Sequence, residues 1–163
     1  MTLGNVLFVG NANAARSIMA EAYMNLAGRG LCRAFSAGNA PAGEVNPLAI
    51  ETLRSAGIRC RNLSSKSRAL FTMPVSPRMG LIVFVGAQAA TGAERYWPGM
   101  PIIHRWNLDD PNDVCGSVAQ KRAAYLACFA QLRQNIDALV LADPLFNVPL
   151  EHLRPAPATG VSK

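Results

Sequence analysis

Short apolar runs alternate with helical segments along this chain, and that alternation limits the fold more than any other feature. Residues 5–9 (NVLFV) form a β-rich run, and residues 81–85 (LIVFV) are continuously apolar, as expected of a strand covered on both faces. A segment of helical composition, 16–27, follows the first run. Strands joined through helices form right-handed crossovers and a largely parallel sheet. We therefore expect an α/β fold with three layers: a four-stranded, parallel, twisted sheet with helices on both faces.

Two further strands and a second helix complete the expected sheet. Residues 31–36 and 102–106 have the composition of strands, and we expect 102–106, like 81–85, to be a central strand. Residues 47–56 carry apolar side chains at helical spacing and end before Gly57, which is a good helix stop. Residues 62–80 mix Ser, Pro and Met without a clear period, which predicts a short helix within an irregular connection.

The clearest helix in the sequence spans Val118 to Leu141. Its apolar positions advance by four, three, four and three residues, namely Tyr125, Phe129, Leu132, Ile136 and Leu139. This spacing places them in one stripe along a helix. A proline-containing segment follows, so we expect one domain over residues 1–143 and a C-terminal tail over residues 144–163.

Composition excludes several classes of function. The net charge of +6 favours anionic ligands, but no motif points to nucleic acid. No apolar run is long enough to cross a membrane, and the N-terminus lacks the features of a secretory signal, so we expect a cytoplasmic protein. The four cysteines lack metal-ligand spacing, so we expect reduced thiols with no metal and no cofactor. The oligomeric state is not indicated.

The loop after the first strand is the strongest candidate for a binding site. It consists of small residues that end in an arginine and a serine at the start of a helix: Gly10, Asn11, Ala12, Asn13, Ala14, Ala15, Arg16 and Ser17. Backbone amides at a helix N-terminus, together with a guanidinium, form a cradle for phosphate-like oxyanions. The loop completes neither a nucleotide nor a dinucleotide motif. The alternative is a tight turn followed by an arginine on a solvated helix face.

This loop and several later segments resemble the low-molecular-weight phosphotyrosine protein phosphatases and the thioredoxin-coupled arsenate reductases. Those proteins begin with a strand, a C-x5-R-[ST] loop with an Asn at its fourth position, and a helix. The matching residues here are Leu7–Val9, Asn13, Arg16–Ala22, Ser36–Gly38, Val45–Ala49, Trp97–Gly99 and Asp110–Pro111. The resemblance covers roughly residues 4–142 and implies the fold of these phosphatases.

The resemblance also implies what this chain lacks. The family's nucleophilic cysteine corresponds to Gly10, so the covalent phosphoenzyme step is unavailable. The relay cysteines of the reductases correspond to Gly86 and Glu94, whereas Asp110 matches the family's general acid. We expect a catalytically deficient protein that binds phosphate, sulfate or a phosphorylated ligand through residues 11–17. The alternative is an active phosphatase or reductase-like enzyme with a non-standard nucleophile.

Two other features remain open. Cys115 follows the loop that contains Asp110, so it is the cysteine whose reactivity most merits a test. A basic run between residues 54 and 68 contains Arg54, Arg59, Arg61, Lys66 and Arg68 without an acidic residue between them. It either binds an acidic partner or, as is more common for such runs, forms a solvated face.

Overall fold

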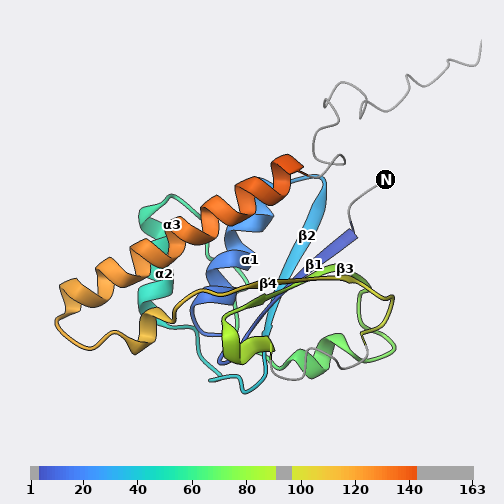
Figure 1. Ribbon diagram of the computed structural model, residues 1–163, viewed down its shortest axis with the longest axis horizontal. Coiled ribbons are helices and arrows are strands. Elements are labelled where there is room, and N and C mark those ends of the chain that lie inside the picture. Colours follow the sequence, from blue (N-terminus) through green and yellow to red (C-terminus); the bar gives the residue numbers. More distant parts are fainter. Residues whose placement is uncertain (1–3, 91–96, 143–163) are drawn as a thin grey trace, which may run out of the picture.

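The computed structural model describes residues 4–90 and 97–142 and contains one four-stranded parallel sheet. Its strands are β1 (Gly4–Gly10), β2 (Cys32–Gly38), β3 (Met79–Val85) and β4 (Ile102–Trp106), arranged in the order β2-β1-β3-β4 (Figure 1). The predicted parallel sheet is confirmed, and each predicted strand lies within two residues of the observed one.

The strand order creates a switch point at the carboxyl ends of β1 and β3. From β1 the chain crosses to β2 on one side and later returns to β3 on the other side. The pairings of Gly10 with Gly38 and of Val9 with Phe84 place the carboxyl ends of these strands side by side. Open α/β sheets bind ligands at such a switch point, where the two crossovers diverge.

Three α-helices cover one face of the sheet: α1 (Arg16–Ala27), α2 (Pro47–Ser55) and α3 (Val118–Ala142) (Figure 1). The predicted stripe on α3 is confirmed, because Tyr125, Phe129, Leu132 and Ile136 are all buried. They belong to the same core cluster as the side chains of Val6, Phe8 and Val83 from the sheet. The packing of α3 on this cluster holds the preceding loop, residues 107–117, near the end of the sheet.

Short 3₁₀ helices cover the opposite face. η1 (Arg68–Phe71) and η2 (Ala87–Ala90) contribute Phe71 and Ala89 to a second core cluster, together with Leu7, Val9, Ile82, Phe84 and Trp97. The α/β fold with helices on both faces is therefore confirmed, and η1 is the short helix expected within residues 62–80. A third 3₁₀ helix, η3 (Pro111–Asp113), precedes α3. Within the described parts of the chain, no helix has the length and apolar character that a membrane span requires.

The prediction that residues 102–106 form a central strand is wrong. β4 pairs only with β3 and therefore lies at the edge of the sheet. Ile102 is 66% exposed, so the apolar composition of this strand does not reflect burial on both faces. The expected tail, residues 144–163, lies outside the described residues.

Candidate functional site

The loop between β1 and α1 directs its backbone carbonyls away from its own centre. These carbonyls accept hydrogen bonds from backbone amides of residues 39–46. The acceptor and donor residues are Gly10 with Asn39 (3.2 Å), Asn11 with Ala40 (2.9 Å), Ala12 with Ala42 (2.9 Å) and Ala14 with Asn46 (2.8 Å). The outer segment thus supports the loop along most of its length.

The loop amides are left facing inward. In a trans peptide the C=O and N–H groups point in opposite directions, so outward carbonyls turn the following amides toward the loop centre. The hydrogen bonds between described residues include none donated by the backbone amides of residues 11–17. The first turn of α1 contains no acidic residue, and Ala15 provides no side-chain cap. Unpaired amides at a helix N-terminus form a site of positive potential.

Asn13 fixes the shape of this loop with both ends of its side chain. Its Nδ2 donates to Ser17 Oγ at 2.9 Å, and its Oδ1 accepts from the backbone amide of Lys66 at 2.8 Å. The backbone of Asn13 has φ 47°, a left-handed conformation that asparagine tolerates better than most residues. Ala12 is not among the residues with positive φ, so its methyl group leaves the loop unstrained.

The Arg16 guanidinium lies over the switch point, where it is paired with Asp110. Its Nη2 donates to Asp110 Oδ2 at 2.6 Å, and its Nη1 donates to the Leu108 carbonyl at 2.6 Å. A Cβ on Gly86 would stand 2.3 Å from Nη1, and Gly86 has φ +103°. The absence of a side chain at position 86 therefore provides the space that the guanidinium occupies.

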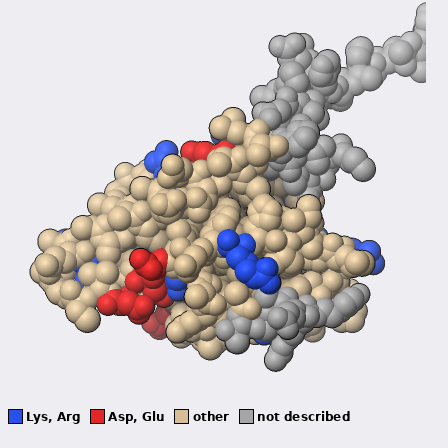
Figure 2. Space-filling view, in the orientation of Figure 1, with Lys and Arg blue, Asp and Glu red and all other residues tan. Residues whose placement is uncertain are grey.

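The segment that carries Asp110 is held against the rest of the protein. Asp110 Oδ1 accepts from the Asn112 amide at 3.0 Å. The Asn112 side chain accepts hydrogen bonds from Asn46 Nδ2, at 2.9 Å, and from the Tyr125 hydroxyl. Burial, followed by the charge of Asp110, raises the pKa of Tyr125 to about 12, so this hydroxyl stays protonated and can donate. Acidic side chains gather near η3 on the face shown in Figure 2.

The enclosed space in this arrangement is too small for a phosphate ion. A hollow of about 10 Å³ is lined by residues 10–17 together with Asp110 and Asn112. A volume of roughly 10–15 Å³ corresponds to one water molecule. The structure thus places the predicted site residues together, and the Asp110 carboxylate forms an ion pair with the Arg16 guanidinium.

Comparison with known proteins identifies the family to which the chain belongs. The family model "Low molecular weight phosphotyrosine protein phosphatase" matches residues 5–143. The chain belongs to this family. No curated protein sequence matches the chain significantly.

Solved structures with the same fold include both phosphatases and arsenate reductases. A low molecular weight protein tyrosine phosphatase from T. tengcongensis has a TM-score of 0.69 at 21% identity, covering 85% of this chain and 98% of its own. An arsenate reductase from Archaeoglobus fulgidus has a TM-score of 0.63 at 24% identity, covering 82% and 97%. An arsenate reductase in the phosphate-binding state has a TM-score of 0.65 at 22% identity, covering 85% and 96%.

In this phosphatase-family chain, Gly10 is the last residue of β1 and lies beside the Ser17 hydroxyl. A Cβ on Gly10 would stand 2.9 Å from Ser17 Oγ and 3.4 Å from Ser17 Cβ. Ser17 is 1% exposed, and its Oγ accepts the hydrogen bond from Asn13. A Cβ at position 10 therefore requires a small movement of the Ser17 hydroxyl group.

None of the cysteines lies in the loop, and none lines the hollow. Burial raises the pKa of Cys32 and of Cys128 to about 11, and it also raises the pKa of Cys60. These thiols are protonated at neutral pH and are poor nucleophiles. Cys115 is exposed, and its Sγ lies 3.8 Å from the Asp113 carbonyl.

The sequence did not reveal the groups that hold Arg16 and the loop in place. The carbonyl of Leu108 anchors Arg16, and Ser65 donates a hydrogen bond to the Ala12 carbonyl at 3.0 Å. Gly86 was singled out only through the resemblance, whereas its role as the space for Arg16 depends on three-dimensional packing. A backbone carbonyl has no sequence signature, and the serine-rich segment 64–67 resembles an ordinary loop.

Proposed function

We propose that this protein is a catalytically deficient member of the family that binds phosphate, sulfate or a phosphorylated ligand without turning it over. One observation carries the proposal: the backbone amides of residues 11–17 have no partner among the described residues, and these residues line one hollow together with Asp110, the partner of Arg16. Oxyanions bind such a combination of amide donors and guanidinium. A related solved structure, described as an arsenate reductase in the phosphate-binding state, accords with this proposal.

The proposed deficiency rests on position 10. The resemblance aligns Gly10 with the family's nucleophilic cysteine, and glycine offers no atom that can attack phosphorus. The pKa values of Cys32, Cys60 and Cys128 are raised, which disfavours a substitute thiolate from these residues. Loss of a nucleophile lowers the rate by several orders of magnitude, whereas an electrostatic cradle retains its binding energy.

In this proposal, anion binding begins with separation of Asp110 from Arg16. The hollow of about 10 Å³ has no room for a phosphate ion while these two side chains are paired. The ligand would take the place of the carboxylate on the guanidinium and accept hydrogen bonds from the loop amides. Asp110 would then act as an internal competitor of the ligand.

The alternative is an active phosphatase that uses a non-standard nucleophile. Its support is that the Ser17 hydroxyl lies 2.9 Å from the Cβ position of residue 10, while the proposed general acid, Asp110, is also beside the loop. In that mechanism, Ser17 Oγ or a water oxygen would bond to phosphorus as the bond from phosphorus to the aryl oxygen breaks. The Asp110 carboxylate would take the proton of the attacking hydroxyl group and pass it to the leaving phenol. This alternative requires measurable hydrolysis of an aryl phosphate.

Isothermal titration with phosphate and with vanadate tests the binding proposal. The unmodified protein should bind both ions, and Arg16→Ala should abolish binding. Arg16→Lys is the matched variant, because it keeps the charge but loses the planar fork, so we expect weakened binding. Absence of both phosphate and vanadate binding at ion concentrations of tens of millimolar would refute the proposed anion site. Hydrolysis of an aryl phosphate that is lost in Arg16→Ala would instead support the alternative.

A further inference from the structure

A second hollow with basic walls lies away from the cradle, beside β2. Its volume is about 350 Å³, which falls in the range of roughly 300–1,000 Å³ typical of ligand pockets. The residues that line it are Glu21, Ala22, Asn25, Arg33, Ala34, Phe35, Arg59, Arg61, Asn62, Leu63 and Lys66. It shares no lining residue with the cradle hollow. Part of the basic run noted in the sequence therefore forms a wall of a pocket.

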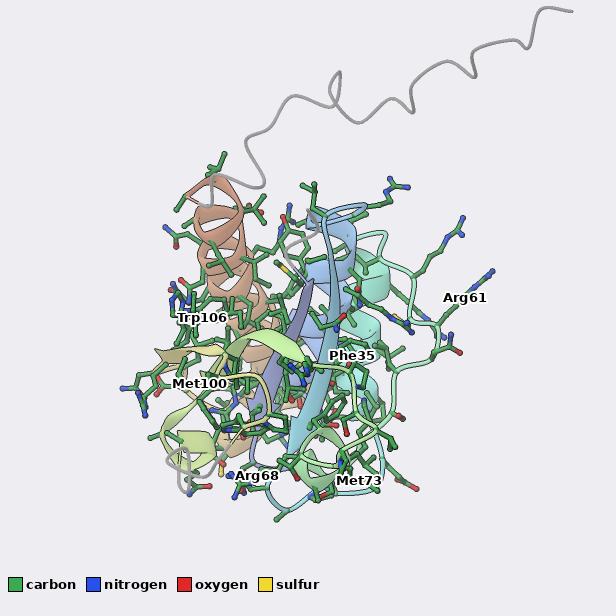
Figure 3. All side chains as sticks on the ribbon, turned by 90° about the vertical axis from the view of Figure 1, so that its right-hand side faces the viewer. Phe35, Arg61, Arg68, Met73, Met100 and Trp106 are labelled. Atoms are coloured by element: carbon green, nitrogen blue, oxygen red, sulfur yellow. The ribbon has the colours of Figure 1, made fainter. Side chains whose placement is uncertain are left out.

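Three guanidiniums of this hollow lack a carboxylate partner. The ion pairs between described residues are Arg16–Asp110, Lys66–Glu21 and Arg122–Glu51, and none involves Arg33, Arg59 or Arg61. All three arginines are exposed, and Figure 3 shows Arg61 projecting outward from the loop after α2. Their charges therefore remain available to a ligand.

The single carboxylate of the hollow is already engaged. Glu21 is 8% exposed and accepts a hydrogen bond from Ser36 Oγ. Lys66 Nζ lies 3.8 Å from Glu21 Oε2, and burial raises the pKa of Glu21. Glu21 is thus neutralised by Lys66 or by a proton, and the remaining wall of the hollow carries an excess of positive charge.

Two contacts favour a small ligand over an added β-strand. Asn25 Nδ2 donates to the Ala34 carbonyl at 3.0 Å, and the Ala34 amide donates to Asn25 Oδ1 at 2.9 Å. This side chain occupies part of the β2 edge, where an extended peptide would otherwise pair. Arg33 lies over the Phe35 ring, 5.0 Å from its centroid, which limits the positions of that guanidinium.

We propose that this flank hollow is a second anion site, selective for a multiply charged phosphate group such as a diphosphate. Arg33, Arg59 and Arg61 line the same hollow, and each carries a guanidinium able to bind two oxygen atoms, so together they offer more donors than a single phosphate ion satisfies. The site is distinct from the cradle, because the two hollows share no lining residue. It does not require the proposed function, because none of its residues contacts the anion in that proposal.

Titration calorimetry with inorganic pyrophosphate tests the flank site at physiological ionic strength. The Arg16→Ala variant removes the cradle guanidinium, so binding that persists in it reports the flank hollow. Adding Arg59→Ala and Arg61→Ala to that variant should weaken pyrophosphate binding at least tenfold. The matched control adds Arg105→Ala and Lys121→Ala, which remove the same charge from exposed positions outside the hollow. The control should bind as Arg16→Ala does.

Three results would overturn the flank site. Pyrophosphate binding that vanishes in Arg16→Ala would assign all of it to the cradle. Equal weakening by the two double substitutions would indicate a diffuse effect of net charge. Absence of pyrophosphate binding to the unmodified protein would also refute the site. Failure of phosphate binding at the cradle is recognised separately, by titration of the unmodified protein with phosphate.

Discussion

Replacing Asp110 with asparagine should strengthen phosphate binding. The Asp110 carboxylate and the Arg16 guanidinium are 2.6 Å apart, with side chains that are 24% and 11% exposed. A charge-assisted hydrogen bond contributes about 1.5–3 kcal/mol, and an exposed ion pair about 0.2–1 kcal/mol. For this partly exposed pair we take about 1–2 kcal/mol, which corresponds to a factor of about 5–30. The expected result is tighter phosphate binding by that factor.

The substitution is conservative for the fold. Asp110 is the N-cap of η3 and accepts a hydrogen bond from the Asn112 amide, a role that asparagine performs about equally well. Isothermal titration with phosphate at pH 7 measures the effect. Asp109→Asn is the matched control, since it removes the same charge from the neighbouring exposed residue, which has no ion pair with Arg16. Equal gains in both variants, or no gain in Asp110→Asn, would refute competition by the carboxylate.

Three further predictions each concern the surroundings of a single residue. Gly86→Ala should weaken phosphate binding about tenfold in the same titration and destabilise the fold by about 1 kcal/mol, because its Cβ meets Arg16 Nη1 and φ is +103°. Burial raises the pKa of Glu21 above its ordinary value of about 4.5, so the folded state loses stability when this carboxyl group ionises. The free energy of unfolding of the unmodified protein, relative to that of Glu21→Gln, should therefore fall as pH rises from about 4.5 through the raised pKa. Urea unfolding that shows no such fall would contradict this prediction. Cys115 should react with a thiol reagent at pH 8 faster than Cys128, whose pKa burial raises to about 11, and equal rates would contradict the burial of Cys128.

Local pattern was sufficient to predict much of the fold. The stripe on α3 follows directly from side-chain spacing, and four of its five residues are buried, while Leu139 is partly buried. The strand at 81–85 is apolar throughout because β3 is covered on both faces. β4 has a similar composition but lies at the edge, since strand order depends on contacts between distant segments. Composition alone does not distinguish these two positions.

The residues of the candidate site could be predicted from the sequence, but the ion pair between Arg16 and Asp110 could not. The small residues of the loop and its helix start indicated a cradle, and the structure brings residues 10–17 beside Asp110. The ion pair between Arg16 and Asp110 joins residues 94 positions apart, and its geometry depends on the space above Gly86 and on the Leu108 carbonyl. Neither the space nor the carbonyl direction is encoded in a short motif.

Aryl phosphate hydrolysis by Gly10→Cys, measured beside the unmodified protein, tests the central claim most directly. Gly10 does not have a positive φ, and the new Cβ would need only a small shift of the Ser17 hydroxyl, so the variant should fold. We predict no turnover by the unmodified protein and clear turnover by Gly10→Cys, which Arg16→Ala then removes. Turnover by the unmodified protein, or a folded but inactive Gly10→Cys variant, would contradict an intact cradle that lacks only its nucleophile.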